Sequence, residues 1–475
     1  MDISALLCGS HTRAKSGILA GMLYIIQKIG YKYMLLQGYK GIDLALIGLS
    51  ERITKATRVC ERVTRYGEDK KFTNLNITIM TKSKIQAFKV FYRDFYYGNR
   101  DTELQIGVEY KTGEKIKFKA YTEPLLALKE HPHLLYNRYC IVELMDAEEV
   151  SCCCYCYASR RFKIQKEISV QEFINMCINY QVNKFPNLPF DDNQQIDVVE
   201  KINTFVKSNA NFATIKSNSK DYADIVSIGR SARINVKGDL SKIISSGDYA
   251  RIFVAGKSSI VASNANNATI ETNNNGERAI ILSNGDEAKI ISNAEYDGII
   301  SNGFLSEIIS YEYRARIYSQ GVGAEIHCNG QGVEIRSLGD NAFIETSGDY
   351  AKVTTDGQGS VVSSSGLGDE IISNGSFSKI ISAGHSVDIV SKGDFAKIFI
   401  TSDCARVDSK GNNSTIVCQG AGSKVRAKVG SYITTIGVTS DEREPLMTHT
   451  ERVDGVHIKG DTWYFVREGE FEEVE

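Results

Sequence analysis

Four cysteines crowd into one short stretch of the chain, at Cys152, Cys153, Cys154 and Cys156. Thiolates bind soft metals, but structural zinc sites use ligand pairs that are about two to four residues apart, usually on two turns. Neighbouring residues of a strand point to opposite faces, so these four thiols would not all reach one ion. We therefore predict buried or half-buried strand cysteines and no metal ligands.

Two histidines, His131 and His133, flank Pro132 and would share one face of an extended segment beside Glu130. Such a group could bind a metal or exchange protons, although we favour a solvated loop. Three further histidines stand alone in the sequence: His327, His385 and His457. No glycine-rich phosphate loop, dinucleotide fingerprint, nucleophile elbow or His-Glu-x-x-His motif occurs. We therefore predict no catalytic residue, no bound cofactor and no enzymatic activity.

The charge balance argues against a nucleic-acid partner. The formal net charge is -2 and the pI is about 6.4, whereas proteins that bind phosphate backbones carry basic patches. The basic runs Arg160-Arg161 and Lys424 to Lys428 are short and include apolar residues. The apolar stretch Gly17 to Ile26 is about half the length that spans a bilayer. With 11 cysteines and no secretory signal at Met1, we expect free thiols, a cytoplasmic location and no membrane partner.

A nine-residue repeat occupies the second half of the chain. From residue 286, successive units read DEAKIISNA, EYDGIISNG, FLSEIISYE and YRARIYSQG. We predict that this register continues unbroken over 277–438. It resumes upstream over 221–274 across the insertion Asn275-Gly276, and one further unit at 211–219 is offset by Lys220. The repeat is thus present in about 25 units, which identifies a solenoid.

Each column of the repeat has a physical meaning, which the unit DYARIFVAG (248–256) illustrates. The third, fifth and seventh residues (Ala250, Ile252 and Val254) alternate along a strand and so lie on its inward face. The fourth residue, Arg251, faces water. The ninth, Gly256, is expected to supply the positive φ of a tight turn. Each unit therefore predicts one short strand and one turn.

Stacked coils let these strands bury their isoleucines against one another. Two units per coil would place two sheets face to face, in a column of 12 to 13 coils that is roughly 60 Å long at a strand spacing of about 4.8 Å. The turns lack the Gly-Gly-x-Gly-x-Asp pattern of calcium-binding rolls, and no regular outward threonine ladder marks an ice-binding face. We predict a mainly β protein: a parallel β-solenoid with an N-terminal α+β capping domain.

The sequence before the repeat alternates between strand and helix patterns. We predict a β-hairpin over Ile106–Ala120 that turns at Thr112-Gly113, and a strand over Tyr139–Leu144. We also predict a helix over Ser169–Tyr180 and a second helix over Asp197–Val206. In the first of these helices, Ser169 is the expected N-cap, with Glu172 three residues later.

We predict four regions. Residues 1–79 form an N-terminal extension that is either a helical domain or a non-native start, and both interpretations stay open. Residues 80–206 form an α+β domain that covers the first coil, because an open solenoid end is an unpaired sheet edge. Residues 211–438 form the solenoid. Residues 439–475 form a C-terminal β cap of two short strands and a turn, in which Trp463, the single tryptophan, closes the last coil.

Four segments together resemble a family of bacterial and phage proteins of unknown function. They are AFKVFYRDF (87–95), IGVEYKTGEKIKFKA (106–120), RYCIVEL (138–144) and DTWYFVREGEFEEVE (461–475). That family combines an N-terminal α+β domain, a Ser/Ala-rich nonapeptide solenoid and a final Asp-Thr-Trp-Tyr hairpin. One departure is that Tyr121 to Pro124 stands where the family has a Gly-Phe-His-x-Cys element. The resemblance implies the fold and no activity, and it implies host cytosol as the location if the gene is phage-encoded.

The sixth column of the repeat should face water, yet it is often apolar. Exposed apolar patches usually mark an interface, whereas strand propensity alone would also favour Ile and Phe there. We predict that this column is an interaction surface, made by Ile244, Phe253, Leu282, Ile291, Ile300, Ile309, Tyr318, Ile372, Ile381, Val390 and Phe399. A polar stretch from His327 to Ser363 interrupts it.

The surface suggests a non-catalytic structural or protein-interaction protein, phage-related in its role, that binds a protein partner or a second copy of itself. The alternative is an enzyme or small-molecule-binding protein with its site in residues 80–206. A pocket of converging polar side chains in that domain would favour the alternative, and a filled core would favour the first interpretation.

Overall fold

The computed structural model describes residues 36–38, 41–43, 84–92, 104–112, 117–128, 137–150, 155–184, 191–198, 204–218, 221–273, 278–420, 422–437, 447–467 and 470–474. The chain divides into two compact units, Met1–Ser83 and Lys84–Glu475, and each is treated by itself. In the first unit, β1 (Leu36–Gly38) and β2 (Gly41–Asp43) pair as an antiparallel ladder. The helices expected between residues 1 and 79 lie outside the described residues.

The second unit begins with a seven-stranded sheet of antiparallel pairs, in the order β4-β9-β6-β3-β5-β8-β7. The strands are β3 (Lys84–Tyr92), β4 (Glu109–Lys111), β5 (Phe118–Tyr121), β6 (Asn137–Met145), β7 (Glu148–Glu149), β8 (Cys156–Ser159) and β9 (Arg161–Ile168). The sheet curves strongly. Phe118 on β5 stacks on Phe162 of β9 at 3.7 Å between ring centroids, although two strands lie between β5 and β9 in the sheet. The predicted strand at Tyr139–Leu144 is confirmed within β6.

The predicted hairpin over Ile106–Ala120 is wrong. Its two halves are β4 and β5, which do not pair with each other: β4 pairs with β9, and β5 pairs with β3 and β8. Aromatic residues of both segments stack on Phe162: Phe118 does so from β5, and Tyr110, its partner on the neighbouring strand β4, does so at 5.7 Å. Burial of this aromatic cluster outweighs the local preference for a tight turn.

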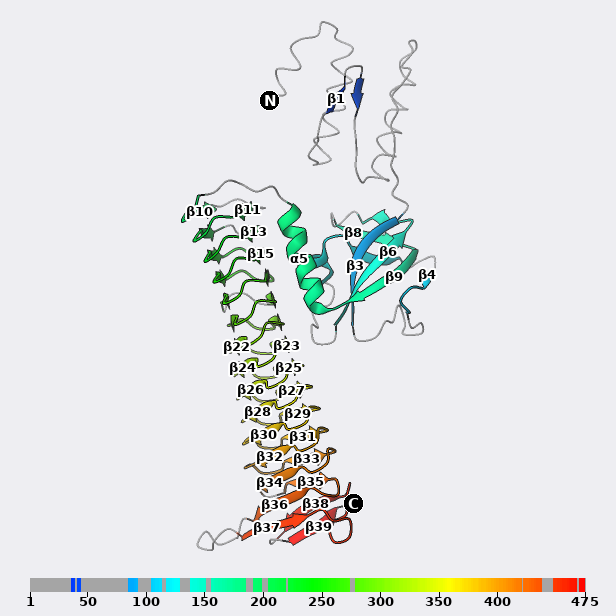
Figure 1. The fold of residues 1–475 in the computed structure, drawn as a ribbon, viewed down its shortest axis with the longest axis vertical. Helices are drawn as coiled ribbons and strands as arrows, with labels where there is room; N and C mark the ends of the chain where they lie inside the picture. The colour runs from blue at the N-terminus through cyan, green and yellow to red at the C-terminus, as the bar shows by residue number, and fades with distance from the viewer. Residues whose placement is uncertain are drawn as a thin grey trace. The chain divides into compact units, whose positions relative to one another are not determined.

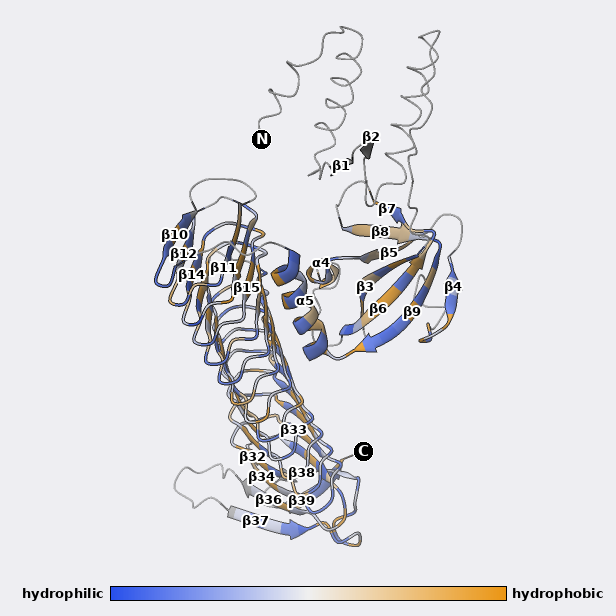
Figure 2. Ribbon diagram, turned by 45° about the horizontal axis from the view of Figure 1, so that its top comes forward, coloured by the Kyte–Doolittle hydropathy of each residue, from blue (hydrophilic) through white to orange (hydrophobic). Residues whose placement is uncertain are grey.

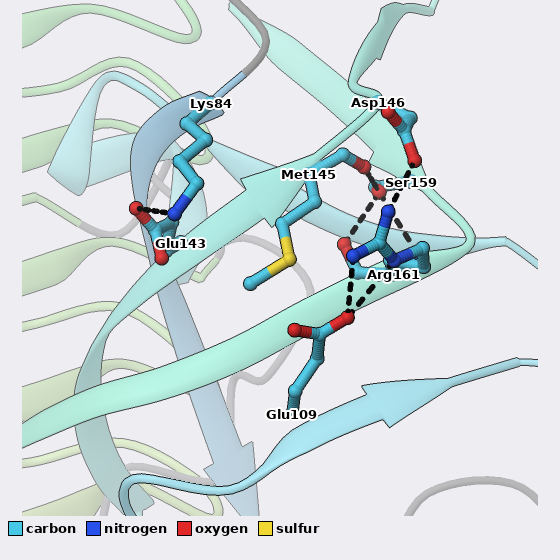
Figure 3. A network of polar contacts seen from close by, with 7 residues as sticks. All are labelled: Lys84, Glu109, Glu143, Met145, Asp146, Ser159 and Arg161. Atoms are coloured by element: carbon cyan, nitrogen blue, oxygen red, sulfur yellow. Dashed lines mark hydrogen bonds and ion pairs between the residues drawn. The ribbon is translucent and has the colours of Figure 1, made fainter.

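A polar network joins β4 and β9 to the end of β6 (Figure 3). The Arg161 guanidinium lies 2.8 Å from Glu109 and 3.3 Å from Asp146. The Ser159 hydroxyl donates to the main-chain oxygens of Met145 and Arg161. The network is largely exposed, so it fixes the geometry of the strand ends and adds little stability.

The sheet is accompanied by two helices: the short α4 (Pro124–Ala127) between β5 and β6, and α5 (Val170–Lys184) after β9. The predicted helix start is confirmed, because the amide of Glu172 donates to the Ser169 hydroxyl at 3.1 Å. One side of α5 is buried at Val170, Phe173, Ile174, Cys177 and Ile178. That spacing gives one continuous apolar stripe on a helix.

The rest of the unit is a parallel solenoid of about 13 turns with two strands per coil, as predicted. Alternate strands stack into two sheets, drawn as two columns of labels in Figure 1. The even sheet contains β10 (Gln195–Val198), β12 (Thr214–Ser217), β14 (Arg233–Val236), β16 (Arg251–Val254), β18 (Thr269–Thr272), β20 (Lys289–Ser292), β22 (Glu307–Ser310), β24 (Glu325–Cys328), β26 (Phe343–Thr346), β28 (Val361–Ser364), β30 (Lys379–Ser382), β32 (Lys397–Ile400), β34 (Thr415–Gln419) and β36 (Tyr432–Gly437).

The odd sheet contains β11 (Thr204–Ser208), β13 (Ala223–Ser227), β15 (Lys242–Ser245), β17 (Ile260–Ser263), β19 (Ile280–Ser283), β21 (Gly298–Ser301), β23 (Arg316–Ser319), β25 (Glu334–Ser337), β27 (Lys352–Thr355), β29 (Glu370–Ser373), β31 (Asp388–Ser391), β33 (Arg406–Ser409) and β35 (Lys424–Ala427). The predicted strand phase is confirmed. In β16 and its flanks, Ala250, Ile252 and Val254 are at most 2% exposed, whereas Arg251 is exposed. Each fully buried isoleucine of this core contributes roughly 1.5 to 3 kcal/mol.

The solenoid extends further upstream than predicted. Residues Gln195–Val198 and Thr204–Ser208 are strands β10 and β11, and Ile196 pairs with Ile215 in the coil below. The helix predicted over Asp197–Val206 is therefore wrong. Its apolar residues also fit alternation along strands, and pairing with the next coil satisfies backbone groups that a helix end would leave open.

The register breaks once near the end of the column. The parallel partner of Thr415 is Tyr432, which is 17 residues later, whereas the coils just above repeat after 18 residues, as Lys397 and Thr415 do. Ser431 just before β36 and Ile433 and Thr435 within it are consequently the inward residues. The prediction of an unbroken register from Glu277 to Val438 is wrong for this last unit.

The turns also differ from the prediction. The ninth-position glycines allow close stacking: a Cβ on Gly375 would overlap the carbonyl oxygen of Gly357 in the neighbouring coil. The positive φ falls instead on the second position of the next unit, for example at Tyr350 (φ 58°) and Phe377 (φ 60°). Asp side chains at the first position link the stacked turns of neighbouring coils, since Asp340 accepts from the amide of Gln358 at 2.8 Å.

Antiparallel strands close the lower end of the column. They are β37 (Met447–Arg452), which pairs with β36, and β38 (Trp463–Arg467) and β39 (Glu470–Val474), which extend the odd sheet from β35. The two-stranded hairpin is confirmed, but Trp463 does not enter the core. Tyr464, 4% exposed, faces inward beside Val425, and Trp463 lies outside between the guanidinium groups of Arg406 and Arg426, each 4.7 Å from its ring. Within the described residues, no helix has the length and hydrophobicity to cross a membrane.

Candidate interaction surface

The sixth column divides between the two sheets. Ile244, Leu282, Ile300, Tyr318, Ile372 and Val390 belong to the odd sheet, and Phe253, Ile291, Ile309, Ile381 and Phe399 belong to the even sheet. In the strands, the sixth residue points away from the core, because the fifth and seventh residues are buried on the inner face. The two faces differ in what covers them.

The upper part of the odd column is covered by helix α5. Ile244 is 1% exposed, and Leu282 and Ile300 are 0% exposed, in one apolar cluster with Phe173, Ile174, Cys177 and Ile178 of α5. Tyr318 packs at its lower edge, partly buried. Ile244 and Ile300, which we predicted to face a separate partner, are therefore occupied within the chain. The α+β domain packs on the flat outer face of the odd sheet. The prediction that it covers the open end of the first coil is therefore wrong.

An asparagine ladder frames this contact. Asn264 and Asn284, at the eighth position of successive odd-sheet units, donate to the Asn175 side chain on α5 at 2.8 Å and 3.2 Å. Asn302 continues the ladder and donates to Asn284 at 2.6 Å. Stacked identical amides suit a solenoid, because each coil repeats the position of the last. The ladder fixes where the helix lies along the column.

Glu123 is the charged centre of the same contact. Its carboxylate is fully buried and accepts from Gln181 at 2.7 Å, from Lys184 at 3.2 Å and from Lys242 of the solenoid. Burial lowers the pKa of Lys184, but the charge of Glu123 and a hydrogen bond with Tyr155 outweigh burial and raise that pKa above its usual value. A buried carboxylate with three donors is satisfied, so this cluster joins the domain to the solenoid.

The even column has no such cover among the described residues. Its sixth-position side chains Ile291, Ile309, Ile381 and Phe399 are half-buried, and Val417 extends the lower patch. In Figure 2, orange (hydrophobic) segments recur along the coils of the column. On the odd face, Ile372 and Val390 are also half-buried and lie below the part that α5 contacts.

The fourth column of the even sheet carries charges that the sequence reasoning treated only as solvated. Glu307 and Glu325 flank the upper apolar patch, and Lys379 and Lys397 flank the lower one. Glu307 pairs with Lys289 at 2.7 Å. Within the described part of the chain, no carboxylate pairs with Lys379 or Lys397. Alignment of the repeat in steps of 18 residues, which keeps each sheet apart, would have shown that the two glutamates lie above the two lysines on this face.

The histidines and cysteines singled out in the sequence are not brought together into a site among the residues that the structure describes. His327, in the polar stretch of the sixth column, lies 3.0 Å from Glu345 and 3.1 Å from Glu325. Burial lowers the pKa of His327, but hydrogen bonds to the two carboxylates raise it overall. Cys156 is buried, whereas Cys152 to Cys154, His131 and His133 lie outside the described residues.

No family model, curated protein or solved structure matches the chain.

Proposed function

We propose that the protein is a non-catalytic interaction protein whose solenoid presents flat sheet faces to protein partners. The observation that carries the proposal is the contact with α5. The odd face binds a folded element through an apolar stripe, an amide ladder and a buried ion pair. The even face repeats the apolar stripe and adds charged side chains, without a cover among the described residues.

The domain core supports this proposal over the alternative of an enzyme or small-molecule site in residues 80–206. The inside of the curved sheet is filled by large side chains, including Phe91, Phe118, Phe162 and Leu144. The polar side chains that converge around Glu123 bind one another. A filled interior and polar groups that bind one another differ from a ligand site, which is a concave pocket with a few polar groups directed into it.

The origin and location extend the same proposal. The four segments quoted above resemble bacterial and phage solenoid proteins of unknown function, and we extend the proposal to a cytoplasmic protein, in the host cytosol if the gene is phage-encoded. An interaction role fits that setting, because a stacked solenoid builds a long flat surface from one short repeated sequence.

Affinity capture with quantitative mass spectrometry tests the proposal. The full chain and two double variants are immobilised and exposed to a lysate of the native host. Ile291→Lys with Ile309→Lys changes the even face, and Ile372→Lys with Val390→Lys is the matched control on the odd face. We expect the even-face variant to lose a captured protein at least tenfold, because two buried isoleucines contribute roughly 3 to 6 kcal/mol together. Equal capture by all three proteins would refute the proposal.

A further inference from the structure

The even face is complementary to itself when one copy is turned upside down. In its upper half the fourth position carries Glu307 and Glu325, with Lys289 on the outermost strand β20, and in its lower half it carries Lys379 and Lys397. Each half also has an apolar pair at the sixth position. Two copies related by a two-fold axis parallel to the strands would keep the strand direction and reverse the order of coils.

An axis between β26 and β28 opposes both Glu–Lys pairs and two apolar pairs, and it leaves His327 opposite Ile381. Strand β24 then faces β30 of the other copy, β22 faces β32, and β20 faces β34. At the fourth position, Glu325 meets Lys379 and Glu307 meets Lys397. At the sixth position the apolar contacts are Ile309 with Phe399 and Ile291 with Val417, and near the axis Glu345 meets Ser363.

Neighbouring alignments fit less well. A shift of the partner by one coil in one direction places Lys289 against Lys397, two like charges. The same shift in the other direction places the Glu345 carboxylate against Ile381. Like charges and buried unpaired carboxylates are both unfavourable, so the charge pattern selects one register.

We propose that the even face binds a second copy of this chain, antiparallel and two-fold symmetric, about an axis between β26 and β28. This inference deepens the proposed function by naming its partner, and so it rests on that function. The face from β20 to β34 measures about 38 Å by about 13 Å, or about 500 Å² per copy, at ordinary strand spacing. Stable interfaces bury about 800 Å² per partner, so the expected dimer is weak, with a dissociation constant of about micromolar order.

Charge exchange tests the pairing directly. The acidic variant carries Lys379→Glu and Lys397→Glu, and the basic variant carries Glu307→Lys and Glu325→Lys. Sedimentation velocity of the full chain at up to about 100 µM should show wild-type dimers and monomers of each variant, because each variant opposes like charges at all these contacts. An equimolar mixture of the two should dimerise again, since every opposed pair is then Glu with Lys.

The control variant carries Lys392→Glu and Lys424→Glu, exposed lysines of the odd side, and changes the net charge as the acidic variant does. It should remain dimeric, and thermal melts of all variants report on folding. A monomeric wild type, a dimeric acidic variant or a mixture that stays monomeric overturns the proposal. If self-association fails in this way while host capture still depends on Ile291 and Ile309, only the second-copy partner is refuted and the interaction function stands.

Discussion

Single residues decide how closely the coils stack. A Cβ on a ninth-position glycine such as Gly375 would overlap the backbone of the neighbouring coil, so this glycine is needed for space, and the strained φ is taken by the next unit's second residue. Units that end in Ala294 or Glu312 show that other ninth positions accept a side chain. The sequence marks these glycines clearly, but it does not reveal which of two glycine properties matters. Both explanations predict the same letter at the same place, and only the stacked backbone separates them.

The first prediction concerns this stacking. Gly375→Ala should destabilise the protein by roughly 1 to 3 kcal/mol, as overpacked sites do, because the added methyl overlaps the Gly357 carbonyl. Ser365→Ala, at an exposed outward position, is the matched control and should be nearly neutral. Denaturant unfolding measures both. A Gly375→Ala variant as stable as the control would show that the coils are farther apart than described.

A second residue-scale prediction concerns Asp297, which replaces the usual Ala or Ser of the inward third position. It is fully buried and accepts from Ser292, Thr272 and the amide of Ala279. Burial raises its pKa to about 7, against the opposing effect of these hydrogen bonds. Because the folded pKa exceeds the unfolded value of 3.8, the folded state binds the proton more tightly. Its contribution is fully present below that unfolded value and is lost as pH rises to about 7.

Asp297→Asn should therefore flatten part of the pH dependence. Stability is measured between the unfolded and folded pKa values for both proteins, and the difference between them removes the contributions of other groups. The wild type should lose stability relative to the variant as pH rises. A difference that is constant with pH, or that grows in the opposite direction, would exclude a raised pKa at Asp297.

At the scale of elements, the strands of the nine-residue repeat could be predicted from the sequence, whereas several elements before the repeat could not. The strand phase follows from alternation of small and large residues, which every coil repeats. The segment at Asp197–Val206 satisfies both a helical and a strand pattern, and pairing with Thr214–Ser217 and Ala223–Ser227 decides between them. Similarly, the segments of β4 and β5 look like a hairpin locally, but both contact Phe162, a residue far along the chain.

The contact of α5 gives an element-scale prediction. Leu282→Lys places a charge beneath the helix, where Leu282 is 0% exposed, and should weaken docking by roughly 3 to 5 kcal/mol, as uncompensated buried charges do. The solenoid should stay folded, because the side chain points away from its core. Val390→Lys, on the same face below the helix, is the control. Limited proteolysis should cut the Leu282→Lys protein between domain and solenoid much faster, and equal rates would contradict the described contact.

At the scale of the whole molecule, the sequence predicted the column and its outward apolar stripe but not how that stripe is shared. Helix α5 of the same chain covers the upper half of the odd stripe. The repeat could not indicate this contact, because α5 is not part of the nine-residue repeat. On the even face, no element within the described residues covers the apolar stripe or the charges beside it. The division explains why Ile244 and Ile300 are buried while Ile309 and Phe399 remain partly exposed, although all four occupy the same repeat position.

The central claim is that the even face binds a second copy of this chain, and hydroxyl-radical footprinting tests it most directly. Side-chain oxidation is compared in dilute protein, near about 1 µM, and at about 100 µM, a range that spans a dissociation constant of micromolar order. The account predicts that Ile309 and Phe399 become protected at the higher concentration while Ile372 and Val390 on the odd face do not change. Unchanged oxidation at Ile309 and Phe399, or protection at Ile372 and Val390 instead, would contradict it.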